Sequence, residues 1–220
     1  MATASTGGLL DQAVAVADSF LPRGRIVSTR GRHPDSFQLF NASGRDLTRG
    51  LPVVVLVNGQ SASAAEIVAA ALQDRGRAVV VGSNSYGKGT VQNITRLPNE
   101  GELILTWARF HAPSGYALEN LGVMPNFCTA QIGARNDAAS ALDTQVQESR
   151  IVLTAWRTHS GYDAASGSAM RARCPRVTEK PARDIAIALQ VLADKAIYAR
   201  ATAASIPSVA RSPQTGNLRR

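Results

Sequence analysis

The sequence predicts an α/β fold in which a parallel sheet is built from β-α-β units. Residues 52–58 (PVVVLVN) and 77–82 (RAVVVG) are continuous, largely β-branched apolar runs. Such runs are typical of parallel strands that are covered on both faces. Between them, Ser61–Asp74 begins with serine and is rich in alanine, a composition that predicts a helix. Two strands and a helix within about 30 residues form one β-α-β unit.

A helix and a short strand are predicted before this unit. Apolar residues recur at helical spacing from Leu9 to Leu21, and Pro22 and Gly24 then end the pattern. Residues 26–28 favour a short strand.

A β-hairpin and C-terminal helices are predicted after the unit. Residues 90–97 and 102–110 are β-rich runs, joined by the turn signal of residues 98–101. Residues 136–158 and 181–201 have helical periodicity.

These elements suggest three parts of the chain. We expect a core over residues 1–130, a C-terminal helical region over residues 131–204, and a flexible basic tail over residues 205–220. The chain has 220 residues and is 45% hydrophobic, which excludes a wholly disordered protein. No apolar run reaches the ~20 residues of a membrane span, and no basic, apolar leader is visible at the start, so we expect neither a transmembrane segment nor a signal peptide in this chain.

The charge and the rare residues exclude several kinds of site. Most of the net charge of +8 comes from residues after 130, and no Lys/Arg stripe carries interleaved aromatic residues, so no nucleic-acid partner is expected. Two cysteines and three widely separated histidines do not form a metal-ligand motif, and we predict no metal site.

One motif resembles a phosphate-binding loop but lacks its context. The stretch from Gly82 to Lys88 begins like GxxxxGK[ST], yet Gly89 follows in place of Ser or Thr. The next residues favour a strand, whereas a phosphate loop needs a helix N-terminus there. A nucleotide site is therefore not expected.

Ser61 and Ser63 lie where a strand gives way to a helix. This position is at the carboxyl edge of a parallel sheet, where α/β proteins place their sites, and it is close to unpaired helix N–H groups. A serine there can act as a nucleophile beside an oxyanion hole. The alternative, and the ordinary role of a serine before an alanine-rich helix, is that Ser61 and Ser63 are N-cap and first-turn residues.

Lys88 supplies a possible partner for a nucleophilic serine. It is flanked by Gly87 and Gly89, and its loop follows the neighbouring strand of the sheet. A lysine withdrawn from water loses its proton more readily than its reference pKa of ~10.4 indicates, and can then serve as a general base. In an extended chain Gln92 shares a face with Lys88 and can orient its amine. A solvated loop lysine is the alternative.

Three separated stretches together resemble the C-terminal processing peptidases, also called tail-specific proteases (peptidase family S41). They are residues 6–32 (TGGLLDQAVAVADSFLPRGRIVSTRGR), residues 53–92 (VVVLVNGQSASAAEIVAAALQDRGRAVVVGSNSYGKGTVQ) and residues 105–126 (LTWARFHAPSGYALENLGVMPN). The second is similar to the family's SASASE and GKGxVQ motifs. All three occur in family order.

The resemblance implies a role for individual residues. The nucleophile falls on Ser63, the general base on Lys88 and the orienting residue on Gln92. The oxyanion donors fall on the backbone N–H of Ala64 and on the Gly7-Gly8 pair. Ala65 replaces the third serine of the motif, and Asn126 stands where aspartate is common.

The resemblance also implies a fold, an activity and partners. The fold is a ClpP/crotonase-like α/β core with a β-hairpin and C-terminal helices. The activity is that of a serine endopeptidase that cleaves proteins near their C-termini, with a protein or peptide substrate and no cofactor. Counterparts of the family's PDZ domain and of the strand before the glycine pair are absent, so we expect a partial core. The alternative is a non-catalytic remnant or a protein-interaction module.

The resemblance further implies a periplasmic or cell-envelope location. That setting suits a disulfide, for which Cys128 and Cys174 are the only two candidates. A bond between them would close a loop of about 45 residues and stabilise the fold by up to ~4 kcal/mol in the chain-entropy account. Two buried, unpaired thiols are the alternative.

Overall fold

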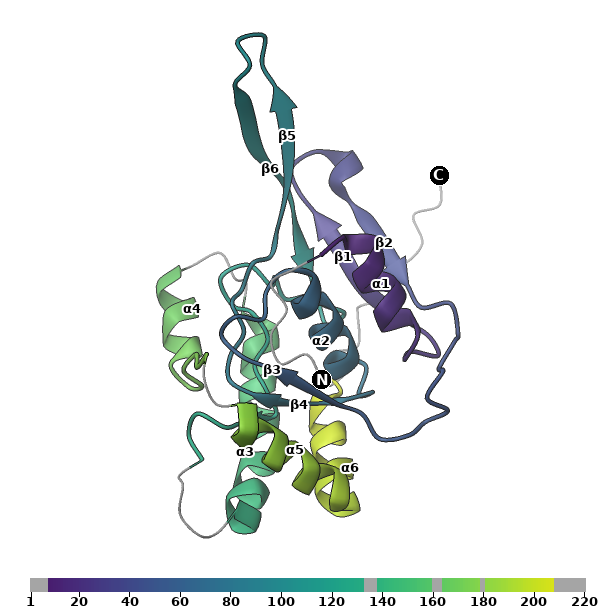
Figure 1. The fold of residues 1–220 in the computed structure, drawn as a ribbon, viewed down its shortest axis with the longest axis vertical. Helices are drawn as coiled ribbons and strands as arrows, with labels where there is room; N and C mark the ends of the chain where they lie inside the picture. The colour runs from purple at the N-terminus through teal and green to yellow at the C-terminus, as the bar shows by residue number, and fades with distance from the viewer. Residues whose placement is uncertain (1–7, 133–137, 160–163, 179–180, 208–220) are drawn as a thin grey trace, which may run out of the picture.

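The described part of the chain forms one parallel and one antiparallel sheet. The computed structural model describes residues 8–132, 138–159, 164–178 and 181–207. The parallel sheet has the order β3-β4-β7 and consists of β3 (Val54–Val57), β4 (Val79–Gly82) and β7 (Phe127–Cys128). The antiparallel sheet has the order β2-β1-β6-β5 and consists of β1 (Arg25–Arg30), β2 (Gln38–Asn41), β5 (Thr90–Arg96) and β6 (Glu102–His111). The β5–β6 hairpin extends away from the body of the molecule (Figure 1).

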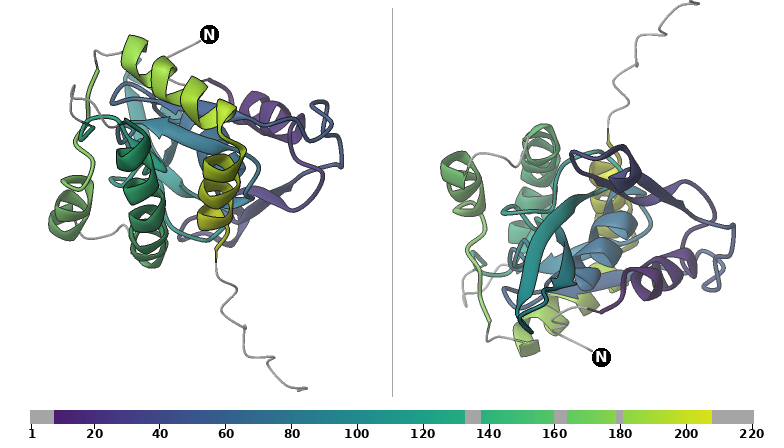
Figure 2. Two further views of the ribbon diagram at one scale, coloured as in Figure 1. Left: turned by 90° about the horizontal axis from the view of Figure 1, so that it is seen from below. Right: turned by 90° about the horizontal axis from the view of Figure 1, so that it is seen from above.

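Helices cover the two faces of the parallel sheet. Helix α2 (Ala64–Asp74) packs against β4 and against α1 (Leu10–Asp18). On the other face lie α3 (Ala138–Thr158), α5 (Pro181–Ala193) and α6 (Lys195–Ser205), as Figure 2 shows from below. A further helix, α4 (Ala164–Arg171), lies beside α3, and a short 3₁₀ helix spans Pro34–Ser36.

The side chains of β4 alternate between two hydrophobic clusters. Val80 belongs to the cluster that includes α1 and α2. Val79 and Val81 join Phe127 and apolar residues of α3, α5 and α6 in a second cluster. This two-sided burial is the physical reason for the uninterrupted apolar run of residues 78–81.

The predicted β-α-β unit, hairpin, N-terminal helix and short strand are confirmed. The central helix begins at Ala64 rather than Ser61, because residues 58–61 form a turn in which the Ser61 N–H donates to the Asn58 carbonyl at 2.9 Å. The expected single helix over residues 181–201 is wrong. Asp194 ends α5 and caps α6, since its carboxylate accepts the N–H groups of Ala196 and Ile197, each at 2.9 Å.

Some sequence expectations concern residues that the structure does not describe. Residues 136–137 of the predicted helix and residues 208–220 of the predicted tail lie outside the described ranges. None of the helices within those ranges combines the length and the apolar composition that crossing a bilayer requires.

Asn126 joins β4, α2 and α6 through a buried amide. Its side-chain oxygen accepts the Val80 N–H at 2.9 Å and the Gln73 side-chain N–H at 3.0 Å. Its side-chain nitrogen donates to the Ser205 hydroxyl at 2.7 Å and to the Ala201 carbonyl at 3.3 Å. The amide thus uses both its acceptor and its donor capacity, which a carboxylate cannot do.

We expect Asn126→Asp to destabilise the fold by about 2–4 kcal/mol, because it places a carboxylate oxygen against the Ala201 carbonyl and removes both donors. Urea unfolding followed by circular dichroism measures the change. Asn99→Asp is the matched control, since Asn99 is exposed and its side-chain oxygen only accepts the Gly101 N–H, which aspartate can also do. Equal stability of the two variants would contradict the role assigned to Asn126.

Candidate active site

Ser63 occupies a strained turn between β3 and α2. Its backbone has φ 56° and ψ −117°, a region that non-glycine residues rarely adopt, and it is the N-terminal cap of α2. A serine at a sharp strand-to-helix turn presents its hydroxyl at the end of the sheet, as in the nucleophile elbows of α/β-hydrolases. Ser63 is partly exposed.

A free backbone donor lies directly after Ser63. Within the described ranges, no hydrogen bond uses the N–H of Ala64, which belongs to the first turn of α2. Gly8 is close by, because a Cβ built on Gly8 would lie 3.7 Å from the Ala64 Cβ. Gly7, the other glycine of the pair, lies outside the described residues.

Glu66 connects the Ser63 turn to the Lys88 loop. Its Oε2 accepts the N–H of Ser63 at 2.8 Å and the N–H of Lys88 at 2.9 Å. Its Oε1 accepts the N–H of Gly87 and the hydroxyl of Ser85. The backbone nitrogens of the two predicted catalytic residues therefore lie on either side of one oxygen atom.

Glu66 has no role among the residues predicted from the sequence. The signal that could have identified it is the Ser-x-x-Glu spacing from Ser63, which is that of a capping box. Here the glutamate satisfies the cap N–H and also reaches donors about 20 residues further along the chain, which local spacing does not reveal.

The glycines on both sides of Lys88 are required by the packing of its loop. Gly87 has φ +85°, and a Cβ there would lie 3.1 Å from the backbone nitrogen of Gly122. A Cβ on Gly89 would lie 2.2 Å from the backbone nitrogen of Glu119. In addition, the Gly89 N–H donates to the Glu119 carboxylate at 2.8 Å. These contacts fix the backbone on both sides of Lys88.

The side chains of Lys88 and Gln92 are exposed. Gln92 lies near the start of β5, where its partner in β6 is Thr106, and a β-bulge in the pairing leaves Trp107 as the extra residue of β6. Because the extra residue lies in β6, the side chains of β5 still alternate between the two faces of the sheet. Residues 90 and 92 therefore lie on the same face. Among the residues described, no hydrogen bond joins Lys88 to Ser63 or to Gln92.

The cysteines of the chain are joined. The Sγ atoms of Cys128 and Cys174 form a disulfide, with a Cα–Cα distance of 5.8 Å. Within the described part of the chain, no group of three or more His, Cys, Asp or Glu side chains is placed to hold a metal ion.

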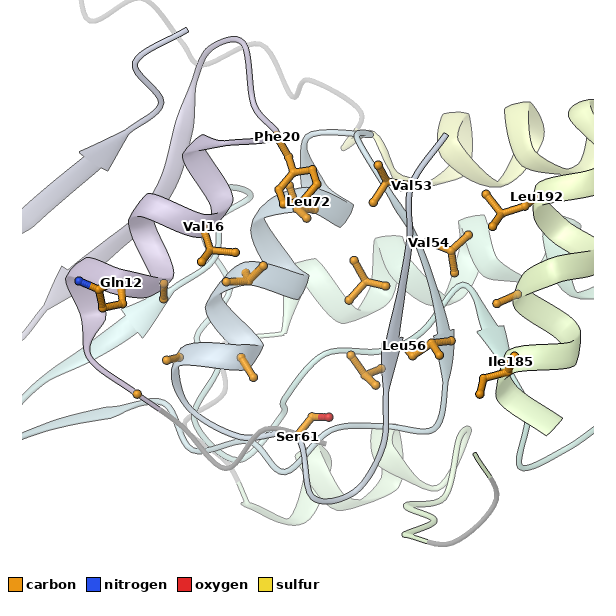
Figure 3. A pocket seen from close by; sticks show the side chains of 18 of the residues that line it. Gln12, Val16, Phe20, Val53, Val54, Leu56, Ser61, Leu72, Ile185 and Leu192 are labelled. Atoms are coloured by element: carbon orange, nitrogen blue, oxygen red, sulfur yellow. The ribbon is translucent and has the colours of Figure 1, made fainter. Parts of the chain in front are cut away.

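An apolar groove runs along β3 and reaches the Ser63 turn. It has a volume of about 680 Å³ and is walled by α1 and α2 on one side and by α5 on the other. Figure 3 shows Ser61 at one end of the groove, Val16 of α1 on one side, and Ile185 and Leu192 of α5 on the opposite side. β3 is an edge strand of its sheet, and Val54, Val55 and Leu56 are only half-buried, in contrast to the two-sided burial expected from their sequence.

Burial raises the pKa of the Glu66 carboxyl above its ordinary value of 4.5, although four hydrogen bonds oppose the shift. A carboxyl group whose pKa is higher in the folded state than in the unfolded state stabilises the folded protein when it is protonated. This stabilisation is fully present below the unfolded-state pKa and is lost as the pH rises through the folded-state pKa.

We therefore expect the stability of the parent relative to Glu66→Gln to increase as the pH is lowered from about 8 to about 4.5. Urea unfolding of both proteins across this range measures the difference. Asp18→Asn is the control, because the Ser43 hydrogen bonds lower the pKa of Asp18 below 3.8 and its contribution is constant over the range. A difference in stability between the parent and Glu66→Gln that does not change with pH would contradict the raised pKa of Glu66.

Comparisons with known proteins show similarity to one family of peptidases. The profile of peptidase family S41 matches residues 3–129. The carboxy-terminal-processing protease of Bartonella bacilliformis is 50% identical over 125 residues, which cover 57% of this chain and 29% of that protein. The carboxyl-terminal-processing protease of a Picosynechococcus species is 37% identical, over 66% of this chain and 37% of the relative.

A solved structure is also similar. The photosystem II D1 C-terminal processing protease matches with a TM-score of 0.51 and 33% identity, over 55% of this chain and 31% of that chain. The present chain thus spans about a third of the length of these relatives. Because the family profile covers more than half of the chain, the α/β protein described here belongs to peptidase family S41.

Proposed function

We propose that this protein is a serine endopeptidase that cleaves polypeptides near their C-termini, with Ser63 as nucleophile and Lys88 as general base. The observation that carries the proposal is the buried Glu66 carboxylate, whose Oε2 accepts the N–H groups of both residues. The N–H of Ala64 beside the Ser63 turn, which bonds to none of the described residues, supports it further. The names of the relatives are consistent with this proposal, since both are called carboxy-terminal- or carboxyl-terminal-processing proteases.

The proposed reaction has two stages. In the first, the Ser63 hydroxyl transfers its proton to the uncharged Lys88 amine while its oxygen attacks the peptide carbonyl. Lys88 then gives that proton to the departing amine, and an ester remains on Ser63. In the second, a water molecule transfers a proton to Lys88 and attacks the ester. The acid product leaves, and the proton returns to the Ser63 oxygen.

Two further groups assist these steps. The Ala64 N–H, together with a backbone N–H of the Gly7-Gly8 pair, stabilises the negative charge on the carbonyl oxygen of the tetrahedral intermediate. Gln92 orients the Lys88 amine once a substrate covers the exposed face of β5. The active complex thus needs the Lys88 side chain to turn toward Ser63, and catalytic hydrogen bonds often tighten only when substrate is bound.

The groove along β3 supports an extended, apolar substrate. It begins beside Gly8, Ser61 and Ala64, and valine and leucine side chains line most of its length. An edge strand also offers unpaired backbone groups to an extended peptide. We propose a location in the cell envelope, outside the reducing cytoplasm, because the Cys128–Cys174 disulfide is stable in an oxidising compartment.

We expect Ser63→Ala and Lys88→Ala each to lower kcat/KM for an unstructured, apolar-tailed peptide by at least about 1,000-fold, since each removes a group that takes part in bond formation. Mass spectrometry of the peptide products measures cleavage. Ser168→Ala and Lys195→Ala, at exposed positions of α4 and α6, are the matched controls and should retain activity. Equal rates for parent and Ser63→Ala would refute the mechanism, and an inactive parent would favour the non-catalytic interaction module.

We expect Glu66→Gln to lower kcat by about 10- to 100-fold with a smaller change in KM, because an amide nitrogen in place of one oxygen repels the N–H donors and shifts Ser63 relative to Lys88. Steady-state kinetics with the same peptide separate the two constants. Glu102→Gln, on the exposed hairpin, serves as the comparison. An unchanged kcat would show that the Glu66 bridge does not set the catalytic geometry.

A further inference from the structure

Residues 173–178, which we call the strap, cross the loop that leads to Ser63. The N–H of Gly59 donates to the carbonyl of Val177 at 3.0 Å. The approach is close, because a Cβ built on Gly59 would lie 3.0 Å from the Cβ of Arg176. The strap comes from the part of the chain beyond residue 129, outside the match to the family profile.

The strap also crosses the loop that leads to Lys88. The N–H of Val177 donates to the Ser83 hydroxyl at 3.0 Å, and that hydroxyl donates to the Val177 carbonyl at 3.1 Å. The Arg176 guanidinium donates to the carbonyls of Ser85 and Tyr86, the first at 3.0 Å. It also lies over the Tyr86 ring, 5.2 Å from its centre.

A disulfide fixes the strap to the parallel sheet. Cys174 is fully buried and is bonded to Cys128 of β7. Cys128 in turn is the register partner of Gly82, the last residue of β4. Since the Lys88 loop starts directly after Gly82, the covalent anchor lies at the base of the loop that the strap contacts. At the first residue of the strap, the Gln131 side chain donates a hydrogen bond to the Arg173 carbonyl.

We propose that the strap is a positioning element of the active site, in which Arg176 and Val177 hold the Ser63 and Lys88 loops at a fixed separation and the disulfide keeps the strap in place. This inference rests on the proposed peptidase function. Glu66 joins the two loops on their buried side, and the strap joins them on their outer side. Arg176 is a positioning residue, because its contacts are with loop carbonyls and it acts through Lys88.

The arrangement makes peptidase activity sensitive to a dithiol reductant. Thiol–disulfide exchange breaks the Cys128–Cys174 bond and forms the disulfide of the reductant, so two electrons and two protons pass to the two cysteine thiols. The strap is then held by hydrogen bonds alone. A displacement of about 1 Å between reacting groups can cost up to about 100-fold in rate, so even a modest loosening is measurable.

The kinetic test compares the oxidised parent with the parent reduced by dithiothreitol, with the Cys128→Ser/Cys174→Ser double variant and with Arg176→Ala. We expect kcat for the apolar-tailed peptide to fall about ten-fold in each case, with KM changing less than two-fold. Arg176→Lys should recover part of the loss, because it keeps a cation over Tyr86 but loses the paired hydrogen bonds. Arg173→Ala is the matched control within the strap and should keep the parental kcat.

Hydrogen exchange provides a readout that does not depend on activity. We expect reduction, or Arg176→Ala, to speed exchange at the amides of residues 59–63 and 85–89 while protection in β3 and β4 is unchanged. Unchanged kcat in the reduced parent and in Arg176→Ala would overturn the inference, as would loss of protection throughout the sheet. An oxidised parent that cleaves no peptide would instead refute the proposed peptidase, and the exchange pattern alone would then decide whether the strap holds the loops.

Discussion

The candidate site depends on one buried carboxylate. Removing a charged group from water is costly, and Glu66 is fully buried, so its hydrogen-bond donors are needed to offset that cost. One donor comes from Ser63 and three come from the loop after β4. Neither loop can move away without leaving the carboxylate short of donors. The Glu66 hydrogen bonds that stabilise the first turn of α2 thereby also fix the relative position of the two loops. A local helix cap thus acts as a tertiary constraint.

Close backbone packing restricts the Lys88 loop from the opposite direction. Gly87 and Gly89 lie against residues 118–122, where a side chain on either glycine would meet backbone atoms. The carbonyls of the two glycines accept the N–H groups of Asn120 and Phe110 at 3.0 and 2.7 Å. The loop is therefore bound on one side by a polar bridge and on the other by steric contact. The Lys88 side chain is exposed and keeps the freedom to turn toward a substrate.

The β-α-β unit was predictable because its signals are local: apolar runs, an alanine-rich helix and turn residues occur in chain order. The roles of Ser63, Lys88 and Gln92 came from motifs. The strained backbone at Ser63 was not predicted, because the helix was expected to begin at Ser61. The bridging role of Glu66 and the contacts of Arg176 were not predictable, since each depends on residues far apart in the chain that meet only in the folded state. The break at Asp194 was missed because helical periodicity continues across it, although aspartate is a common helix cap.

The match to the family profile ends at residue 129, but the structural unit does not. Val79 and Val81 of β4 are buried by residues of α3, α5 and α6, so the sheet that ends at the site needs these helices to exclude water from its second face. The helices are also tied to α2 by polar contacts: Arg157 of α3 forms a buried ion pair with Asp74 at 2.8 Å, and Asn126 links Gln73 to α6. A buried ion pair is strongly destabilising to break from one side, so α2 and α3 are energetically coupled. Because α2 carries both Ser63 and Glu66 at its N-terminal end, the C-terminal third of the chain supports the site through the same helix that forms it.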